Sequence, residues 1–204
     1  MRRLITVLAL TTVATTAHAQ TAAPAGGQAA QGLGGPTIPG VCLLSRQAVM
    51  ANAKVAVAAS DRLRALTQQA QQEIDGERQP VETDIKAFNA EAAKLPETQR
   101  LQRQQALQAR LQPIEAKTRL RAREIDATRE KALERISTEL QPVVAQVYKQ
   151  RQCGLLIDRN SVIGGNMAND LTAAVTQGLD AKISTITFNR ETLPAEQAAA
   201  APAR

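Results

Sequence analysis

The chain has 204 residues, with 25 lysines and arginines against 19 aspartates and glutamates, so its net charge is +6. A basic chain could bind nucleic acid, but Phe88, Tyr148 and Phe188 are too few and too scattered to stack bases. The single histidine is His18, and the sequence contains neither a glycine-rich phosphate loop nor a Gly-x-Ser-x-Gly motif. These features argue against a nucleic-acid-binding protein and against an enzyme, and they imply no cofactor.

Residues 1–19 have the layout of a secretory signal peptide. Two arginines precede an apolar run over residues 4–10, and small residues then suit cleavage after Ala19. A membrane anchor would need about 20 unbroken apolar residues, and the threonines within residues 11–16 interrupt this stretch. We therefore expect an exported chain, whose mature form loses two arginines and has a net charge of +4.

Residues 20–40 are rich in Ala, Gly, Gln and Pro and contain almost no large apolar side chain. This composition predicts a flexible linker without a core. Residues 41–46 then open with a short apolar run that has strand character and a polar exit.

Residues 47–152 carry an apolar pattern with an eleven-residue repeat, about 3.67 residues per turn, which keeps the stripe on one face of a nearly straight helix. Pro96 disfavours a helical residue before it and suits the first turn of the next helix. The pattern predicts a long antiparallel hairpin of two helices with its turn near residues 95–97, and a mainly α fold. The repeating positions are Leu63, Ile74 and Ile85 in the first arm, and in the second arm Ile114, Ile125, Ile136 and Val147 with a companion series of Leu111, Ala122, Leu133 and Val144.

Two further prolines lie at nearly equal distances from the turn, Pro80 before it and Pro113 after it. Each removes one hydrogen bond from its helix and tends to kink it. With Gly76 close by, the pair predicts a hinge across both arms. The alternative is that each proline is merely tolerated on a solvated face.

Residues 41–46 and 153–190 together predict a small β-rich body at the foot of the hairpin, with strands near Cys153–Asp158, Ser161–Ile163 and Ile183–Phe188 and a helix before the last of these. So few residues bury little surface, so we expect the body to self-associate. Residues 191–204 return to Pro and Ala and predict a disordered tail. The candidate oligomerisation residues are Leu43, Leu44, Leu155, Leu156, Ile157 and Val162.

The two cysteines of an exported chain suggest a disulfide. Cys42 lies in the first base strand and Cys153 directly precedes the second, so a bridge would close the foot of the hairpin. Two free buried thiols are the alternative. Neither cysteine has the clustered partners that a zinc site needs, so no metal is expected.

The order of these parts resembles the Skp/OmpH family of periplasmic chaperones. The similarity lies in a signal peptide, a strand and a very long basic hairpin, followed by the stretch Leu155–Val162 and the helix start at Asp170–Thr172. It covers residues 41–183 and depends on the order of parts more than on any one motif. The long linker, the two cysteines and the extension past Ile183 depart from the better-known members.

This resemblance implies a homotrimer with a β-rich base, from which three hairpins project as tentacles around a cavity. It implies that the cavity holds unfolded outer-membrane proteins in the periplasm without ATP and prevents their aggregation. A structural coiled-coil spacer or adaptor of the cell envelope is the alternative. Such a spacer would ignore unfolded β-barrel proteins.

A chaperone that must release its client should bind weakly at many points, and the arms carry single apolar residues between charges. Those near the turn are candidates for client contact, although two of them fit the helix seam equally well. The candidates are Phe88, Leu95, Leu101 and Leu107, of which Phe88 and Leu107 are the two that fit the seam.

The second arm is distinctly basic between residues 100 and 135. A positive arm would raise encounter rates with acidic unfolded chains and with anionic lipid or lipopolysaccharide head groups. An ordinary solvated helix surface is the alternative. The candidate basic surface consists of Arg100, Arg103, Arg110, Lys117, Arg119, Arg121 and Arg123.

Overall fold

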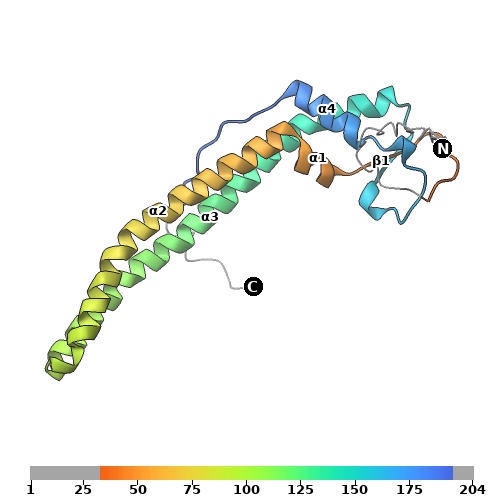
Figure 1. Ribbon diagram of the computed structural model, residues 1–204. Helices are drawn as coiled ribbons and strands as arrows, with labels where there is room; N and C mark the ends of the chain where they lie inside the picture. Colours follow the sequence, from red (N-terminus) through yellow and green to blue (C-terminus); the bar gives the residue numbers. More distant parts are fainter. Residues whose placement is uncertain (1–32, 195–204) are drawn as a thin grey trace, which may run out of the picture. The chain divides into compact units, whose positions relative to one another are not determined.

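The computed structural model describes residues 33–194, in which two long helices run side by side from a small body that contains both strands (Figure 1). The expected signal peptide, residues 20–32 of the expected linker and residues 195–204 of the expected tail lie outside the described residues. In chain order the elements are β1 (Val41–Leu44), α1 (Arg46–Asn52), α2 (Lys54–Glu91), the 3-10 turn η1 (Ala92–Lys94), α3 (Glu97–Gln150), β2 (Leu155–Asp158), the 3-10 turns η2 (Arg159–Ser161) and η3 (Met167–Asn169), and α4 (Thr172–Lys182).

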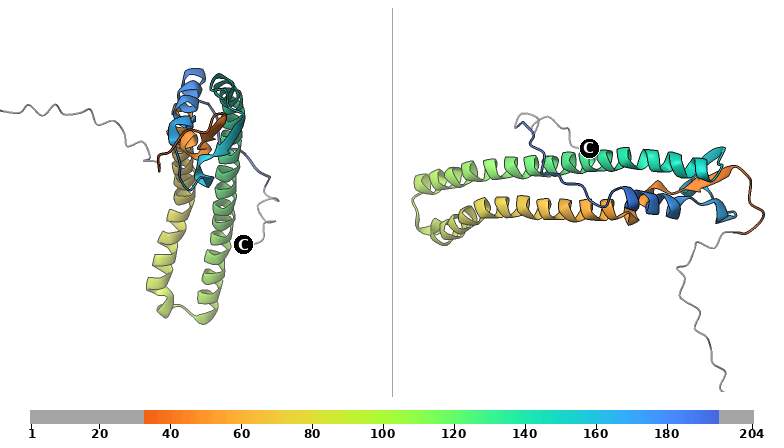
Figure 2. Two further views of the ribbon diagram at one scale, coloured as in Figure 1. Left: turned by 90° about the vertical axis from the view of Figure 1, so that its right-hand side faces the viewer. Right: turned by 90° about the horizontal axis from the view of Figure 1, so that it is seen from above.

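Helices α2 and α3 are antiparallel neighbours along the hairpin, as both views of Figure 2 show. Between them the chain tightens into η1 and then turns at Leu95, whose backbone is extended with φ −85° and ψ 143°. Pro96 is the N-cap of α3. An extended residue before proline is what the clash with the proline ring enforces, so the turn follows directly from the position of Pro96.

The seam of the hairpin contains one of the two apolar series of the second arm. Ile114, Ile125, Ile136 and Val147 are all buried. In the companion series Leu133 is 46% exposed, and the other members are exposed or only half-buried. A single partner helix covers a narrower stripe than a globular core does, so the second series stays at the edge of the seam.

The first arm is not one continuous helix, because the chain breaks at Ala53 between α1 and α2. Ala53 is fully buried with an extended backbone, ψ 137°. Asp180 of α4 accepts a hydrogen bond from the backbone N–H of Lys54 at 2.7 Å and thus caps α2 from a distant part of the chain. The expected helix from residue 47 to the turn is therefore divided into α1 and α2.

The body is less rich in strand than predicted. Strands β1 and β2 pair in parallel, with Val41 opposite Leu155 and Leu44 opposite Asp158. The Asp158 side chain accepts from the backbone N–H of Asn160 at 2.9 Å, and this turn starts η2 where the next strand was expected. Residues Ile183–Phe188 belong to no strand either. Most of the body's buried surface comes instead from α1, α4 and the inner ends of α2 and α3, which share one apolar cluster.

A disulfide joins Cys42 to Cys153, with their Cα atoms 5.8 Å apart. It ties β1 to the chain between α3 and β2. Close by, the carbonyl of Gly40 accepts from the backbone N–H groups of Gly154 and Leu155, at 2.6 and 2.9 Å. The bridge and these bonds set the register in which β2 begins beside β1.

After α4 the chain turns back along the hairpin, and we call residues Ile183–Pro194 the C-terminal segment (Figure 1). Ile186 is buried in the main apolar cluster. The backbone N–H of Glu191 donates to Thr128 Oγ1 at 2.9 Å, and that of Leu193 to Glu124 Oε1 at 3.4 Å. The expectation of a disordered tail from residue 191 is therefore wrong for residues 191–194.

Candidate functional site

A groove near the outer end of the hairpin brings together two of the predicted client-contacting residues, Phe88 of α2 and Leu107 of α3. Both are half-buried. Two ion pairs border the groove. Arg103 pairs with Glu91 at 3.3 Å, and Arg110 pairs with Asp84 at 2.5 Å. The complete lining is Asp84, Ala87, Phe88, Glu91, Arg103, Ala106, Leu107 and Arg110.

The other two candidates lie closer to the turn and outside this groove. Leu101 is 49% exposed on α3, and Leu95 is half-buried in the turn itself. An aromatic and an aliphatic side chain in a shallow slot, together with the exposed Leu101 and the half-buried Leu95 nearer the turn, provide small separate apolar contacts. Each such contact contributes about 1 to 2 kcal/mol at most when covered, so binding here is weak at any one point.

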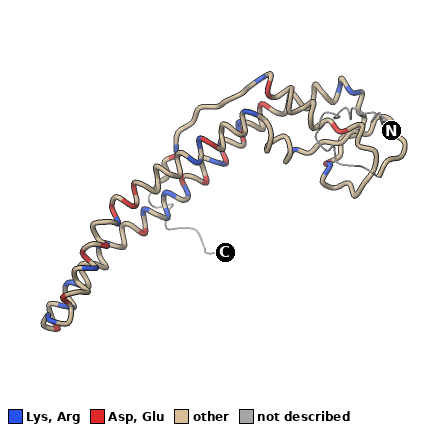
Figure 3. Tube along the Cα trace, viewed as in Figure 1, with Lys and Arg blue, Asp and Glu red and all other residues tan. Residues whose placement is uncertain are grey.

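The predicted basic surface is largely an ion-pair ladder between the two arms. Four of its seven residues contact acidic side chains of α2. Figure 3 shows basic and acidic positions interspersed along both arms. Arg100 and Arg119 are exposed, whereas Arg123 is half-buried. The acidic partners lie on the other arm, so the sequence of the second arm alone does not reveal these pairs. The four pairs are Arg103–Glu91, Arg110–Asp84, Lys117–Glu77 and Arg121–Glu73.

A buried ionic network crosses the hairpin midway along its length. Glu124 of α3 is only 1% exposed. Its carboxylate accepts from Arg121 at 2.7 Å, and Arg190 Nε lies 3.2 Å from it. Arg190 also donates to Glu73 of α2 at 3.1 and 3.4 Å, and Arg121 donates to the same carboxylate at 2.8 Å. Two arginines thus connect carboxylates of both helices and the C-terminal segment.

The charges of this network shift two pKa values. The hydrogen bond from Arg190 lowers the pKa of Glu73 against the opposing effect of burial, and Arg121 lowers it further. Burial opposes the charge on Arg121, but hydrogen bonds to Glu124 and Glu73 raise its pKa overall. Sequence reasoning missed Glu124 and Arg190. The one local signal was that Glu124 directly precedes a buried position of the repeat, Ile125.

The body contains a polar clasp built from Asp170 and Thr172. The Thr172 hydroxyl accepts from the buried backbone N–H of Ser45 at 2.9 Å, and Leu171 N–H donates to Leu43 O at 2.8 Å. Asp170 accepts from Thr172 and also from Arg159 at 2.9 Å. Burial raises the pKa of Asp170, but these hydrogen bonds outweigh burial and lower it. The clasp joins β1, η2 and the start of α4.

The candidate oligomerisation residues divide into two groups. Leu43 and Leu44 are already buried within one chain, so they are not available to a second chain. Leu155 is 53% exposed, and Leu156, Ile157 and Val162 are half-buried. The sequence analysis did not include Ile163 among these candidates. Ile163 follows Val162 directly, and its side chain is fully exposed.

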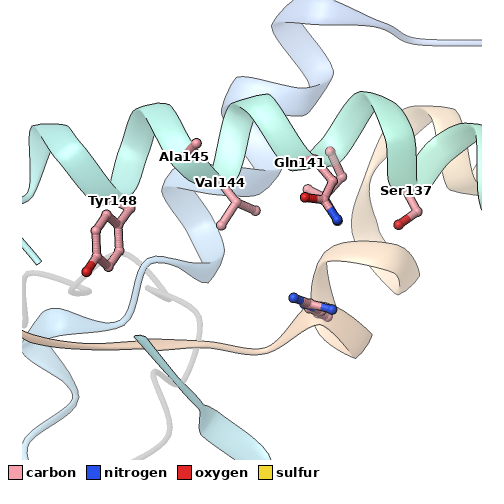
Figure 4. Close-up of a pocket in the computed structure, with 7 residues that line it drawn as sticks. Ser137, Gln141, Val144, Ala145 and Tyr148 are labelled. Atoms are coloured by element: carbon pink, nitrogen blue, oxygen red, sulfur yellow. The ribbon is translucent and has the colours of Figure 1, made fainter. Parts of the chain in front are cut away.

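An open groove runs along the inner end of α3, opposite the start of α1. Leu140, Val144 and Tyr148 supply its apolar side, and Arg46 faces them. Figure 4 shows Val144 and Tyr148 projecting from α3 toward the chain at the start of α1. The groove therefore belongs to the body and is separate from the one at the outer end of the hairpin.

Residues 40–179 match the protein family described as Outer membrane protein (OmpH-like). The chain belongs to the OmpH-like family. A crystal structure from Caulobacter crescentus, of a protein named provisionally as an outer membrane chaperone (OmpH-like), is 38% identical, with a TM-score of 0.71. The similarity covers 80% of this chain and 96% of that one. Among curated proteins, none matches the chain.

The OmpH-like match includes the disulfide, the whole hairpin and the Asp170–Thr172 clasp, but it ends at residue 179. The C-terminal segment therefore lies beyond the matched residues. No helix within residues 33–194 is long and apolar enough to cross a membrane. In the same part of the chain, no His, Cys, Asp or Glu residues gather into a group that could hold a metal ion.

Proposed function

We propose that the mature chain is an ATP-independent periplasmic chaperone, which holds unfolded outer-membrane proteins between its helical arms and prevents their aggregation. Three copies associate through the body, so that the hairpins surround a cavity. Membership of the OmpH-like family and the likeness to a protein named as an outer membrane chaperone support this proposal. The Cys42–Cys153 disulfide suits an oxidising compartment such as the periplasm.

The groove of Phe88 and Leu107 is the observation that carries the proposal. It places an apolar slot far from the body, bordered by ion pairs that join the two arms. A client held there gains little from any single contact and is released easily, while several arms acting together raise the total affinity. The exposed Arg100 adds a positive charge near the turn, which favours encounters with acidic unfolded chains.

Light scattering tests the proposal. An eight-stranded outer-membrane β-barrel protein, diluted from urea, should stay in solution when the mature chain is present at a threefold molar ratio, which is about one trimer per client. Phe88→Ala combined with Leu107→Ala should weaken this protection several-fold. Leu133→Ala is the matched control, because Leu133 is exposed on the same helix but lies outside the groove.

Unchanged aggregation in the presence of the wild-type chain would contradict the proposal and favour a structural spacer of the envelope. Equal protection by wild type and by the groove variant would retain a holdase but move client contact away from Phe88 and Leu107.

A further inference from the structure

The hairpin contacts both the side chains and the backbone of the C-terminal segment. The side-chain contacts include Arg62 with Asn189 at 3.2 Å and Lys131 with Glu191 at 2.5 Å. Arg62 of α2 donates to the backbone carbonyl of Phe188 at 3.1 Å. Arg135 of α3 donates to the carbonyl of Thr187 at 3.2 Å. In the opposite direction, the side chains of Thr128 and Glu124 accept hydrogen bonds from the backbone N–H groups of residues 191 and 193. Four side chains from two helices thus contact the main chain of the segment, and these four contacts do not depend on the identity of its side chains.

The side chains of the segment alternate in the way that an extended strand requires. Ile186 is buried and Phe188 and Arg190 are half-buried, whereas Thr187 and Asn189 between them are exposed. Ile186 enters the main apolar cluster, to which the helices contribute small residues, Ala56 and Ala59 of α2 and Ala132 of α3. We call the face of the hairpin against which Ile186 and Phe188 pack the trough. Small alanine side chains in the same cluster suit an extended chain whose apolar side chains are two positions apart.

We infer that the face of the hairpin under the C-terminal segment is a second client-binding site, which takes an extended stretch of unfolded outer-membrane protein in place of the segment. This inference rests on the proposed function. Strands of outer-membrane barrels alternate apolar and polar residues with a period of two, which is the pattern of the resident segment. The backbone contacts add no sequence requirement beyond that pattern.

The resident segment lowers the apparent affinity of this site for a client. A client reaches the trough only in the fraction of molecules in which the segment has left it, so weakening the segment should strengthen client binding. Arg190 is the residue to change, because its ion pairs with Glu73 and Glu124 hold the segment without contributing to the backbone contacts that a client would reuse.

Amide hydrogen exchange of the full mature chain tests the displacement. Glu191 and Leu193 donate their N–H groups to the hairpin, so both amides should exchange slowly in the free protein. Adding an excess of an unfolded eight-stranded outer-membrane β-barrel protein should speed exchange across residues 186–193 at least about threefold. Exchange in α4 should stay unchanged. Unchanged or slower exchange across residues 186–193 would overturn the inference.

The variant Arg190→Ser provides the second measurement. It should bind the same unfolded protein at least about threefold more tightly than wild type, as measured by fluorescence anisotropy of labelled client. Arg129→Ser is the matched control, because Arg129 is an exposed arginine of α3 whose ion pair joins it only to Asp126 of the same helix. Equal or weaker binding by Arg190→Ser, with a far-ultraviolet circular dichroism spectrum like that of wild type, would also overturn the inference.

Light scattering on the wild-type chain separates the two proposals. A chain that suppresses aggregation while the exchange of residues 186–193 is unchanged retains the proposed function and loses this second site. A chain that does not suppress aggregation loses both.

Discussion

Thr172 holds the start of α4 to the start of α1 through a single hydroxyl group. Its oxygen is the partner of the buried Ser45 N–H, and it donates in turn to Asp170. Thr172→Val keeps the shape but leaves that N–H unpaired, which costs about 1 to 3 kcal/mol. We expect urea unfolding to show a loss of free energy of unfolding in this range.

Thr176→Val is the control for this change. Thr176 lies one turn later on α4 and donates only to the carbonyl of Thr172 within the same helix. Its replacement leaves no buried donor without a partner, so the free energy of unfolding should change by less than about 0.5 kcal/mol. Equal losses in both variants would show that the clasp contributes nothing beyond ordinary helix packing.

Glu73 makes the hairpin sensitive to acid. Its pKa is lowered in the folded chain from an ordinary value of 4.5, chiefly by Arg190. The stabilisation it provides is therefore complete above the unfolded pKa and is lost as the pH falls through the lower, folded pKa. Glu73→Gln should lower the melting temperature at pH 7, and the difference from wild type should shrink when both are measured near pH 3.

Glu82→Gln is the comparison, because Glu82 is an exposed carboxylate on the same helix. It should melt close to wild type at both pH values. If the melting temperatures of wild type and Glu73→Gln differ as much at pH 3 as at pH 7, the charge of Glu73 does not stabilise the network.

At the scale of elements, the two prolines lie beside a small buried cluster in the outer half of the hairpin. Both are exposed and sit inside continuous helices. Their neighbours Val81 and Ile114 are buried together with Ile74 in one small cluster. A bend at this level would therefore carry both arms together and would not separate them.

The hinge remains a prediction, and Pro80→Ala with Pro113→Ala tests it. Each change restores a helix hydrogen bond, and proline is about 3 kcal/mol less favourable than alanine inside a helix. The double variant should melt at a higher temperature and hold the largest clients less well, while small clients are held as before. Distances between spin labels at Leu95 of different subunits should become more narrowly distributed.

Pro142→Ala is the control for the hinge, since it restores the same kind of hydrogen bond in the inner part of α3. It should raise the melting temperature without narrowing the distances at Leu95. Distributions that are equally broad in wild type and in the Pro80 and Pro113 variant would show that these prolines are simply tolerated.

The elements also show which features the sequence could predict. Burial of Ile114 and Ile136 follows from a repeat that is visible in the chain itself, and the position of the turn follows from Pro96. The break at Ala53 has no such local signal, because the group that caps α2 is Asp180, far away in the sequence. A contact between residues that are distant in the sequence therefore determines where α2 begins.

The basic surface remains a prediction, but the sequence could not show which of its charges are paired, for the same reason. The arginines of the second arm are clustered in sequence, but the acids that neutralise them, such as Glu77 and Asp84, are on the first arm. Likewise, residues Ile183–Phe188 were expected to form a strand, yet they belong to none, and the partners of this stretch of chain are helix side chains. The periodicity of a sequence indicates the local conformation of the chain, but it does not identify the residues that pack against that chain.

At the scale of the whole molecule, the body exposes apolar side chains next to the open side of its small sheet. β1 is bonded to β2 and also contacts Asp170 through Leu43, whereas β2 has β1 as its neighbour in this two-stranded sheet. Leu155 and Ile163 are exposed in this region. An exposed strand edge flanked by apolar residues tends to associate with another chain, and this supports assembly through the body.

Leu155→Asp should therefore convert the proposed trimer into monomers that still fold. Leu155 is 53% exposed within one chain, so an aspartate there adds no buried charge to the subunit, but it would be desolvated where subunits meet. Sedimentation equilibrium at micromolar concentration should give three chain masses for wild type and one for the variant. Leu133→Asp, on a residue that is 46% exposed midway along α3, should remain trimeric. A folded wild-type monomer under these conditions, or a Leu155→Asp variant that stays trimeric, would contradict assembly through β2.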